Sequence, residues 1–144
     1  MTFAQERRLW AIVPAAGRGE RFSSANPLSA PKQYTSLLGK SILEWTLLAL
    51  LAEPRIDAIV VVIAADDSHW AHLAAKLNSA KLKSTTGGSH RQESVMNGLE
   101  FLESIARDDD WVMVHDAARP CVSRSELAKL ADALEEDISG AVLA

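Results

Sequence analysis

Three polar segments of the sequence hold most of the residues that could do chemistry: residues 15–31, 87–94 and 115–120. The first two combine glycine with basic side chains, and the third contains an aspartate and an arginine. Glycine turns bring backbone N–H groups close to an anion, and lysine and arginine supply positive charge. Phosphoryl and nucleotidyl transfer depend on charge stabilisation and in-line positioning more than on covalent catalysis. The three segments therefore suggest a site for a ligand that carries phosphate.

In the first segment, Gly17 and Gly19 could form a backbone cradle for phosphate, while Arg21 and the nearby Lys32 would add side-chain charge. The pattern differs from the Walker P-loop, because no glycine-lysine-serine or glycine-lysine-threonine sequence follows the first glycine. It also differs from the dinucleotide-binding fingerprint, because Phe22 stands at the third glycine position. The alternative is an ordinary strand-to-helix turn with surface arginines and a solvated lysine.

In the third segment, Asp116 is the best candidate ligand for Mg²⁺, because this ion is commonly held by one carboxylate together with phosphate oxygens and water. Such a metal would neutralise phosphate charge. The alternative for Asp116 is an ion pair with Arg119 that closes a turn. His115 is interpreted as a packed histidine at the end of a strand, since the further ligands of a zinc site are not found at suitable spacing.

Apolar patterning predicts strands that alternate with helices along the whole chain. The strongest strand is 56–64, whose unbroken valine and isoleucine run is typical of a strand buried on both faces of a parallel sheet. Further strands are predicted at 9–14, 82–86, 111–114 and 140–144, and helices at 42–52, 66–78, 90–106 and 124–137. This order predicts a Rossmann-like α/β fold, a three-layer αβα sandwich with a mostly parallel sheet. Because such folds bind ligands at the carboxyl ends of their strands, the three polar segments should meet there.

Capping boxes mark the starts of three of these helices. A serine three residues before a glutamate or glutamine occurs at Ser41 and Glu44, at Ser89 and Gln92, and at Ser123 and Glu126. In the helix that follows the second pair, Val95, Leu99, Leu102 and Ala106 recur at helical spacing. These four residues are predicted to form its buried face.

Composition bounds the kind of protein. The chain has 144 residues, enough for one domain with a core, and a formal net charge of −4, which argues against general nucleic-acid binding. It has one cysteine, Cys121, and lacks both a signal peptide and an apolar run of about 18 residues that could span a membrane. We therefore expect a soluble cytoplasmic protein without nucleic-acid or membrane partners. The sequence stops inside the apolar run GAVLA, so we also expect it to be part of a longer protein.

Motifs in all three segments resemble one enzyme family. VPAAGRGERF with PKQY, then GG followed by R and SV, and finally VHDAARP occur in the order found in 2-C-methyl-D-erythritol 4-phosphate cytidylyltransferases. This family transfers a cytidylyl group from CTP to a sugar-alcohol phosphate and releases pyrophosphate in non-mevalonate isoprenoid biosynthesis. Ribitol 5-phosphate cytidylyltransferases share the motifs, so they remain an alternative, as do other sugar-phosphate nucleotidyltransferases and an inactive CTP-binding fragment.

The resemblance implies a role for each matching residue. Arg21 and Lys32 would be catalytic, stabilising the pentacoordinate transition state at the α-phosphate of CTP. Asp116 would hold Mg²⁺ or another divalent cation and, together with Arg119, would bind the acceptor, whose phosphate Arg119 would contact. The residues expected to bind the nucleotide are Ala15, Ala16, Gly17, Gly19, Gly88, Arg91, Ser94 and Ala117. Within this group, Gly88 should approach the cytosine and Ala117 should lie against the ribose.

The resemblance also sets expectations for the whole protein. Residues 1–144 would form the nucleotide-binding core of a nucleotidyltransferase domain, without the C-terminal part and the dimerisation arm of the homodimeric family. The partners would be CTP and a sugar-alcohol phosphate. Residues 23–30, between Arg21 and Lys32, make this loop longer than the family pattern, and we predict that they form a hinge that is poorly ordered without nucleotide and closes over the triphosphate.

Overall fold

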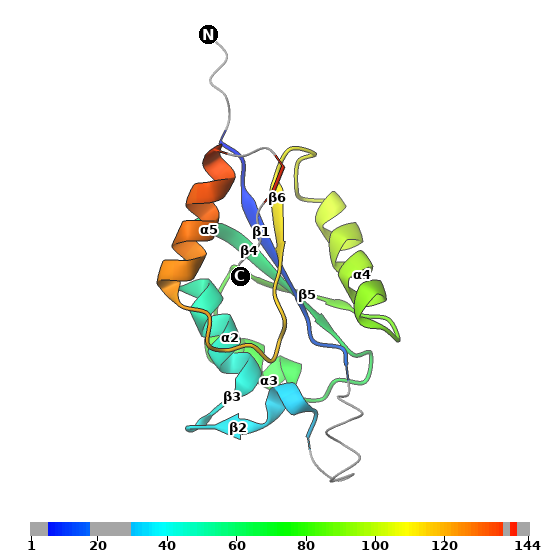
Figure 1. Ribbon diagram of the computed structural model, residues 1–144. Helices are drawn as coiled ribbons and strands as arrows, with labels where there is room; N and C mark the ends of the chain where they lie inside the picture. Colours follow the sequence, from blue (N-terminus) through cyan, green and yellow to red (C-terminus); the bar gives the residue numbers. More distant parts are fainter. Residues whose placement is uncertain (1–5, 18–29, 137–138, 141–144) are drawn as a thin grey trace.

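A parallel sheet forms the centre of the computed structural model, which describes residues 6–17, 30–136 and 139–140 (Figure 1). Within this described part, the sheet has four strands in the order β5-β4-β1-β6. They are β1 (Leu9–Pro14), β4 (Ile56–Ile63), β5 (Leu82–Thr86) and β6 (Trp111–Val114). Along the chain, β4 and then β5 are added on one side of β1, and β6 is added on the other side. The direction in which the sheet is built therefore reverses between β1 and β6. Ligand sites of open α/β sheets lie at such reversal points.

The two central strands are buried on both faces. Ile12 and Val13 of β1 and Val60 and Val61 of β4 are fully inaccessible to solvent. In the register of the sheet, Ile12 lies opposite Val60 on one side and Val114 of β6 on the other. The sequence prediction of a valine-rich strand buried between two layers is therefore confirmed for β4, and β1 shares this environment.

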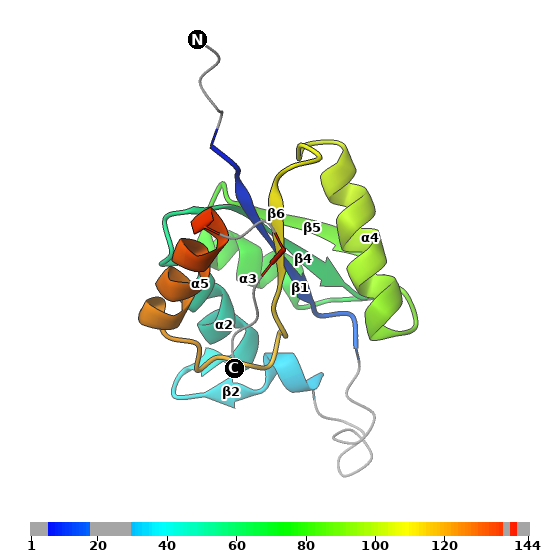
Figure 2. The same cartoon turned by 45° about the horizontal axis from the view of Figure 1, so that its top comes forward.

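Helices cover both faces of the sheet, as a three-layer sandwich requires. On one face lie α2 (Ile42–Leu51), α3 (Trp70–Leu77) and α5 (Arg124–Glu136), while α4 (Arg91–Glu103) lies on the other, as two views show (Figure 1; Figure 2). Helices on both faces follow from the right-handed crossovers that join parallel strands. The predicted fold class is confirmed.

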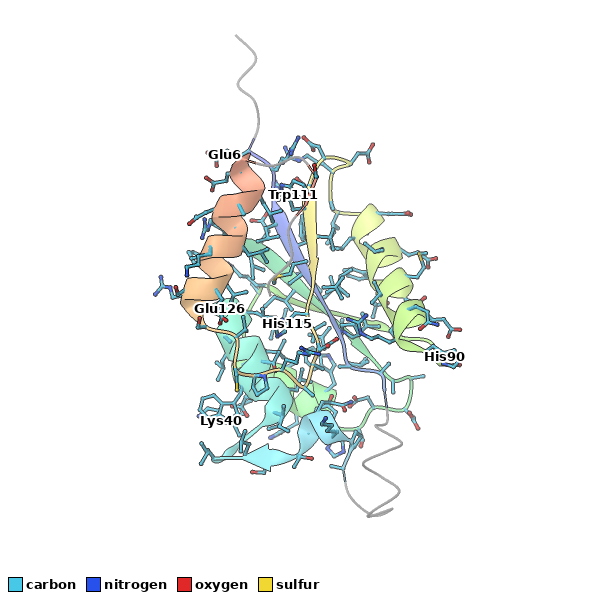
Figure 3. The ribbon with its side chains drawn as sticks, in the orientation of Figure 1. Glu6, Lys40, His90, Trp111, His115 and Glu126 are labelled. Carbon is cyan, nitrogen blue, oxygen red and sulfur yellow. The ribbon has the colours of Figure 1, made fainter. Side chains whose placement is uncertain are left out.

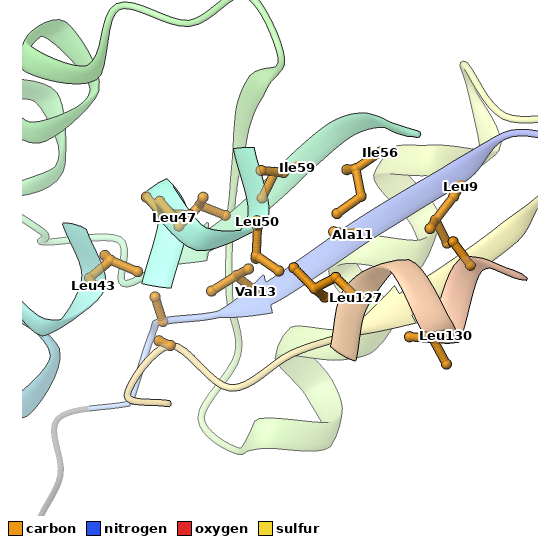
Figure 4. Packing of buried hydrophobic residues seen from close by; sticks show 14 of the residues in the cluster. Leu9, Ala11, Val13, Leu43, Leu47, Leu50, Ile56, Ile59, Leu127 and Leu130 are labelled. Carbon is orange, nitrogen blue, oxygen red and sulfur yellow. The ribbon is translucent and has the colours of Figure 1, made fainter. Parts of the chain in front are cut away.

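The larger core lies between the sheet and the helices α2, α3 and α5. Figure 4 shows leucines of α2 and α5 pointing at the small and branched side chains of β1 and β4. Each fully buried leucine stabilises the fold by about 1.5–3 kcal/mol relative to an exposed one. The members labelled in the picture are Leu9, Ala11, Val13, Leu43, Leu47, Leu50, Ile56, Ile59, Leu127 and Leu130.

Of the three predicted capping boxes, the one at Ser123 and Glu126 is confirmed in full, while at Ser41 only the serine cap is confirmed, because the Glu44 carboxylate binds Nζ of Lys76 at 2.9 Å. The Ser41 side chain accepts a hydrogen bond from the Glu44 N–H at 3.1 Å at the start of α2. Before α5, the Ser123 hydroxyl accepts from the Glu126 N–H at 3.2 Å, and the Glu126 carboxylate accepts from the Ser123 N–H at 2.7 Å. Such reciprocal bonds satisfy backbone N–H groups that the first helical turn leaves unpaired.

The third predicted box, Ser89 with Gln92, is wrong by one residue. The cap of α4 is His90, and the Glu93 carboxylate accepts from the backbone N–H of His90 at 3.3 Å and of Ser89 at 2.6 Å. A charged carboxylate is a stronger acceptor than the Gln92 amide and is also favoured by the helix dipole at this end. The helix therefore begins where glutamate, rather than glutamine, occupies its third position.

The buried face of α4 is rotated relative to the prediction. Leu102 is buried as expected, but Leu99 is 36% exposed, and the face continues through Ser94 and Gly98 instead. A Cβ at Gly98 would lie 2.8 Å from Cγ2 of Ile12 on β1. The helix is therefore packed too closely on the sheet for a large side chain at this point. Apolar periodicity could not reveal this face, because two of its members are a serine and a glycine.

Residues 32–41 form small elements that the sequence analysis did not predict. The 3-10 helix η1 (Lys32–Tyr34) leads into a hairpin of two-residue strands, β2 (Ser36–Leu37) and β3 (Lys40–Ser41). Its turn has positive φ at both central residues, 51° at Leu38 and 83° at Gly39. Strands this short carry no periodicity.

The predicted helix 66–78 is shorter in the structure because its first residues form a capping turn. One carboxylate oxygen of Asp67 accepts from the N–H groups of His69 and Trp70, each at 2.8 Å, so α3 begins at Trp70. Residues 141–144 of the last predicted strand lie outside the described residues, as do residues 18–29. Among the helices that are described, none combines the length and the apolar character needed to cross a bilayer.

Candidate active site

The three polar segments meet at the carboxyl end of the sheet. Hydrogen bonds just beyond the strands hold them there: Ala15 N–H donates to the Val62 carbonyl at 2.7 Å, and His115 N–H donates to the Ile12 carbonyl at 2.9 Å. Gly87, which follows β5, donates to the Ile63 carbonyl at 2.8 Å. Figure 3 shows His115 at the end of β6, where the chain leaves the sheet. The segments therefore converge through backbone geometry, as parallel strands require.

The first segment touches the second at a glycine that the sequence analysis did not single out. A Cβ on Gly87 would lie 2.5 Å from Cβ of Ala16 and 2.6 Å from Oγ of Ser94. Real atoms do not approach this closely, so only glycine fits between these two predicted nucleotide-binding residues. The pair Gly87–Gly88 is visible in the sequence, but the prediction named only Gly88, and it is Gly87 that lies between Ala16 and Ser94.

Gly88 and Gly17 differ in their surroundings. A Cβ on Gly88 would clash with the Glu93 side chain that caps α4, so this glycine allows the capping carboxylate to fold back. Gly17 is exposed, and its Cβ position has open space around it within the described residues. Bare backbone beside open space is the arrangement that a close-lying ligand needs.

Lys32 and Gln33 come next to the first segment through η1. Lys32 is exposed and, within the described part of the chain, has no carboxylate within ion-pair distance. The Gln33 side chain is only 6% exposed and donates from Nε2 to the carbonyls of Ala15 at 2.7 Å and Gly17 at 3.2 Å. The sequence analysis did not identify Gln33, although it lies within the PKQY motif.

Asp116 joins the second and third segments through two arginines. Arg91 donates two hydrogen bonds to Oδ1 of Asp116, at 3.0 and 2.8 Å, and Nε of Arg119 lies 2.9 Å from Oδ2. Desolvation by itself raises the pKa of the Asp116 carboxyl, but the hydrogen bonds and charge of Arg91 and then Arg119 outweigh it and lower the pKa below its usual value. The carboxylate is therefore ionised near neutral pH, and the cluster has two positive charges against one negative.

The remaining residues of the third segment fix its backbone. Ala117 is buried, and the Thr46 hydroxyl of α2 donates to its carbonyl at 2.9 Å. Nε2 of His115 lies 2.9 Å from the Arg119 carbonyl, and since a carbonyl only accepts, this nitrogen carries the proton. The His115 contact agrees with its interpretation as a structural histidine.

A groove of about 790 Å³ runs from this cluster along β6 towards α5. Arg91, Asp116 and Arg119 line it at the carboxyl end of β6, and Trp111 and Leu130 line the part beside the strand and α5. Its volume is in the range of small-molecule sites. Arg21 and Gly19, the other predicted residues of the first segment, lie outside the described residues.

Comparison with known proteins first defines the class. The parallel sheet, with its polar segments at the carboxyl edge, is that of a nucleotidyltransferase-like α/β protein, and a nucleotidyl transferase from Methanothermobacter thermautotroptrophicus shares the fold at a TM-score of 0.61 and 20% identity. Residues 9–144 match the family model of 2-C-methyl-D-erythritol 4-phosphate cytidylyltransferase, IspD. The chain belongs to this family.

Individual relatives agree with this assignment. The proteins of this name from Dechloromonas aromatica and Tolumonas auensis are 46% and 48% identical to the chain over 95% and 93% of its length. The Francisella tularensis crystal structure of the same name is 35% identical with a TM-score of 0.68 over 90% of this chain and 53% of that one. A crystal structure of 4-diphosphocytidyl-2C-methyl-D-erythritol synthase is 30% identical with a TM-score of 0.75 over 90% of this chain and 55% of that one. The chain spans 59% and 55% of the length of the two curated relatives.

Proposed function

We propose that the chain forms the CTP-binding core of an enzyme that transfers CMP from CTP to 2-C-methyl-D-erythritol 4-phosphate and releases pyrophosphate. The observation that carries this proposal is a charged cluster at the carboxyl edge of the sheet, in which Arg91 and Arg119, from different segments, both bind the carboxylate of Asp116. Membership of the family supplies the reaction and the acceptor. The chain spans little more than half of the length of its relatives, so the activity of the whole enzyme is part of this proposal.

The proposed reaction is a direct displacement. An acceptor phosphate oxygen attacks the α-phosphorus of CTP, a new P–O bond forms, and the bond to the departing pyrophosphate breaks with its electron pair. Lys32 and Arg21 stabilise the charge on the phosphoryl oxygens during this step, and neither residue forms a covalent intermediate. The exposure of Lys32 is consistent with this role, because its long side chain can reach a ligand beside the first segment.

The other proposed roles are those that the family resemblance implies for the matching residues. Backbone from Ala15 to Gly17, with Gly19, would hold the phosphates, while Gly88, Arg91 and Ser94 of the second segment would contact the base and nucleotide. Ala117 would lie against the ribose. Arg119, which is exposed beyond its bond to Asp116, would bind the acceptor phosphate.

The residues present fit Mg²⁺ only as a metal held largely by its substrate. In the described part of the chain no three acidic, histidine or cysteine side chains gather as a metal cluster, but Asp116 supplies one ionised carboxylate, and an ion would have to replace at least one of its bonds to Arg91 and Arg119. We propose that Asp116 would hold the ion together with phosphate oxygens. When bound, the ion would supply neutralisation of phosphate charge. The homodimer and the cytoplasmic location of the whole enzyme are likewise proposals.

Nucleotide preference tests the first half of this function. Isothermal titration calorimetry with CTP, UTP, ATP and GTP, each with Mg²⁺, should show CTP binding at least about tenfold more tightly than the others, a difference of about 1.4 kcal/mol. The reason is that cytosine needs an acceptor for its amino group as well as donors, and a glycine turn offers both from its backbone. Equal affinity for all four nucleotides would contradict a cytidylyl site.

A further inference from the structure

The Gln33 side chain connects the turn that carries Lys32 to the backbone of the first segment. It is 6% exposed, and its Nε2 donates to two main-chain carbonyls, those of Ala15 at 2.7 Å and Gly17 at 3.2 Å. These carbonyls belong to residues 18 and 16 positions earlier in the chain. A buried polar side chain that spans such a distance closes a long loop with a pair of fixed contacts.

The chemistry of this contact requires an amide. Two carbonyl oxygens need two N–H groups, and the NH₂ group of glutamine supplies both from one uncharged nitrogen. A carboxylate of the same shape would place a negative oxygen against the two acceptors, and an apolar side chain would leave the buried Ala15 carbonyl unpaired. The position therefore tolerates neither glutamate nor methionine without loss, although both have nearly the same length.

The contact also fixes the direction of the loop backbone. In a planar trans peptide the C=O and the following N–H point in opposite directions. Since the Ala15 carbonyl points at Gln33, the N–H of Ala16 points away from it. The Ala15 N–H is itself bound to the Val62 carbonyl at 2.7 Å. Gln33 therefore holds the first segment with the Ala16 N–H directed away from the Gln33 amide.

The turn is anchored on its other side as well. The Tyr34 hydroxyl donates to Oδ2 of Asp67 at 2.8 Å, and the other oxygen of Asp67 caps α3. Within the turn, Tyr34 N–H donates to the Pro31 carbonyl at 2.8 Å. The two residues after Lys32 are therefore both anchored: Gln33 to the backbone that follows β1, and Tyr34 to the aspartate that caps α3. The backbone of Lys32 is fixed while its side chain is exposed.

We propose that Gln33 is the positioning residue of this site. It holds the Lys32 turn and the phosphate-facing backbone of Ala15 to Gly17 as one rigid unit, so that the lysine ammonium meets the α-phosphate of the nucleotide which that backbone holds. The identity of the ligand rests on the proposed function, whereas the link between the two segments rests on the Gln33 contacts alone. A displacement of about 1 Å in such a unit costs about a hundredfold in rate.

Gln33→Met tests the proposal, with Glu100→Met on the exposed face of α4, outside the three polar segments, as the control. Gln33→Met should lower kcat for pyrophosphate release by about ten- to a hundredfold, with a smaller change in KM for CTP. Amide hydrogen exchange provides a readout that needs no activity. The N–H groups of Tyr34 and Thr35 should exchange at least about tenfold faster, while those of β4 keep their protection. Glu100→Met should match the wild type in both measurements.

Gln33→Glu provides a second variant with a distinct signature. A neutral carboxyl can donate one hydrogen bond to these carbonyls, but a carboxylate cannot donate any. The activity of Gln33→Glu relative to wild type should therefore rise severalfold as the pH falls from about 8 to about 5, whereas the relative activity of Gln33→Met stays constant. This variant also keeps the proposal testable if Gln33→Met does not fold, which thermal unfolding would reveal.

The outcomes separate this inference from the proposed function. If the wild type releases no pyrophosphate, the proposed function fails, and the exchange rates of Tyr34 and Thr35 then decide the role of Gln33. Wild-type exchange in Gln33→Met would overturn the inference whatever the activity. Faster exchange with an unchanged kcat would also overturn it, because Gln33 would then be structural without positioning Lys32.

Discussion

Lys32→Ala is expected to lower the rate of pyrophosphate release from CTP at least about a hundredfold while the protein remains folded. Removal of one preorganised group that stabilises transition-state charge typically costs about a hundred- to a thousandfold in kcat. Lys32 is exposed on η1 and has no ion-pair partner among the described residues, so its removal should leave the free energy of unfolding nearly unchanged. Steady-state kinetics with CTP, together with thermal unfolding, measures both effects.

One further variant separates charge from geometry at this position, and a second is a control at another exposed lysine. Lys32→Arg keeps the charge but changes its shape, and should restore only part of the rate. Lys83→Ala removes an exposed lysine on β5 and should behave like the wild type. Turnover by Lys32→Ala at the wild-type rate would show that the lysine has no part in the chemistry.

Asp116→Asn should cause the second-largest loss, at least about a hundredfold in kcat together with a loss of the Mg²⁺ dependence of CTP binding. The substitution removes the negative charge that the metal would meet. It also leaves Arg91 and Arg119 facing each other without the carboxylate that both now contact. Calorimetric titration of CTP at several Mg²⁺ concentrations, combined with turnover measurements, detects both consequences.

Stability is the control for the Asp116 variant. The Asp116 side chain is 36% exposed, and ion pairs at such positions contribute about 1 kcal/mol or less. We therefore expect Asp116→Asn to unfold at nearly the wild-type temperature, and Asp108→Asn in the exposed turn before β6 to retain both stability and activity. An unchanged Mg²⁺ dependence in Asp116→Asn would exclude this carboxylate as the metal ligand.

The architecture could be predicted from the sequence where apolar patterning is strong. The valine run of β4 indicated burial on two faces, and Ser41 and Ser123 marked helix starts that the structure confirms. The hairpin between η1 and α2 could not be predicted, because its strands have two residues each. The face of α4 was predicted wrongly because close packing selected Gly98, which carries no apolar signal.

In the candidate site, too, the sequence motifs could predict which segments are involved but not which side chains touch each other. Motifs indicated which segments would converge, and the strand order explains why they do. The ion pair of Asp116 with Arg119, given as the alternative for this carboxylate, is present, but the motifs could not show that Arg91, which lies 25 residues away in the chain, also binds Asp116. The contact of Gln33 with Ala15 could not be predicted from the sequence either, because a buried glutamine that donates a hydrogen bond looks the same there as a solvated one.

The most direct test of the account is a pyrophosphate-release assay with CTP and Mg²⁺ and with either 2-C-methyl-D-erythritol 4-phosphate or ribitol 5-phosphate as acceptor. We predict release that requires both CTP and methylerythritol phosphate, at a rate at least about tenfold above that with ribitol 5-phosphate. Tight CTP binding without release from either acceptor would contradict the proposed activity of this chain and leave a CTP-binding module. Faster release with ribitol 5-phosphate would contradict the proposed acceptor.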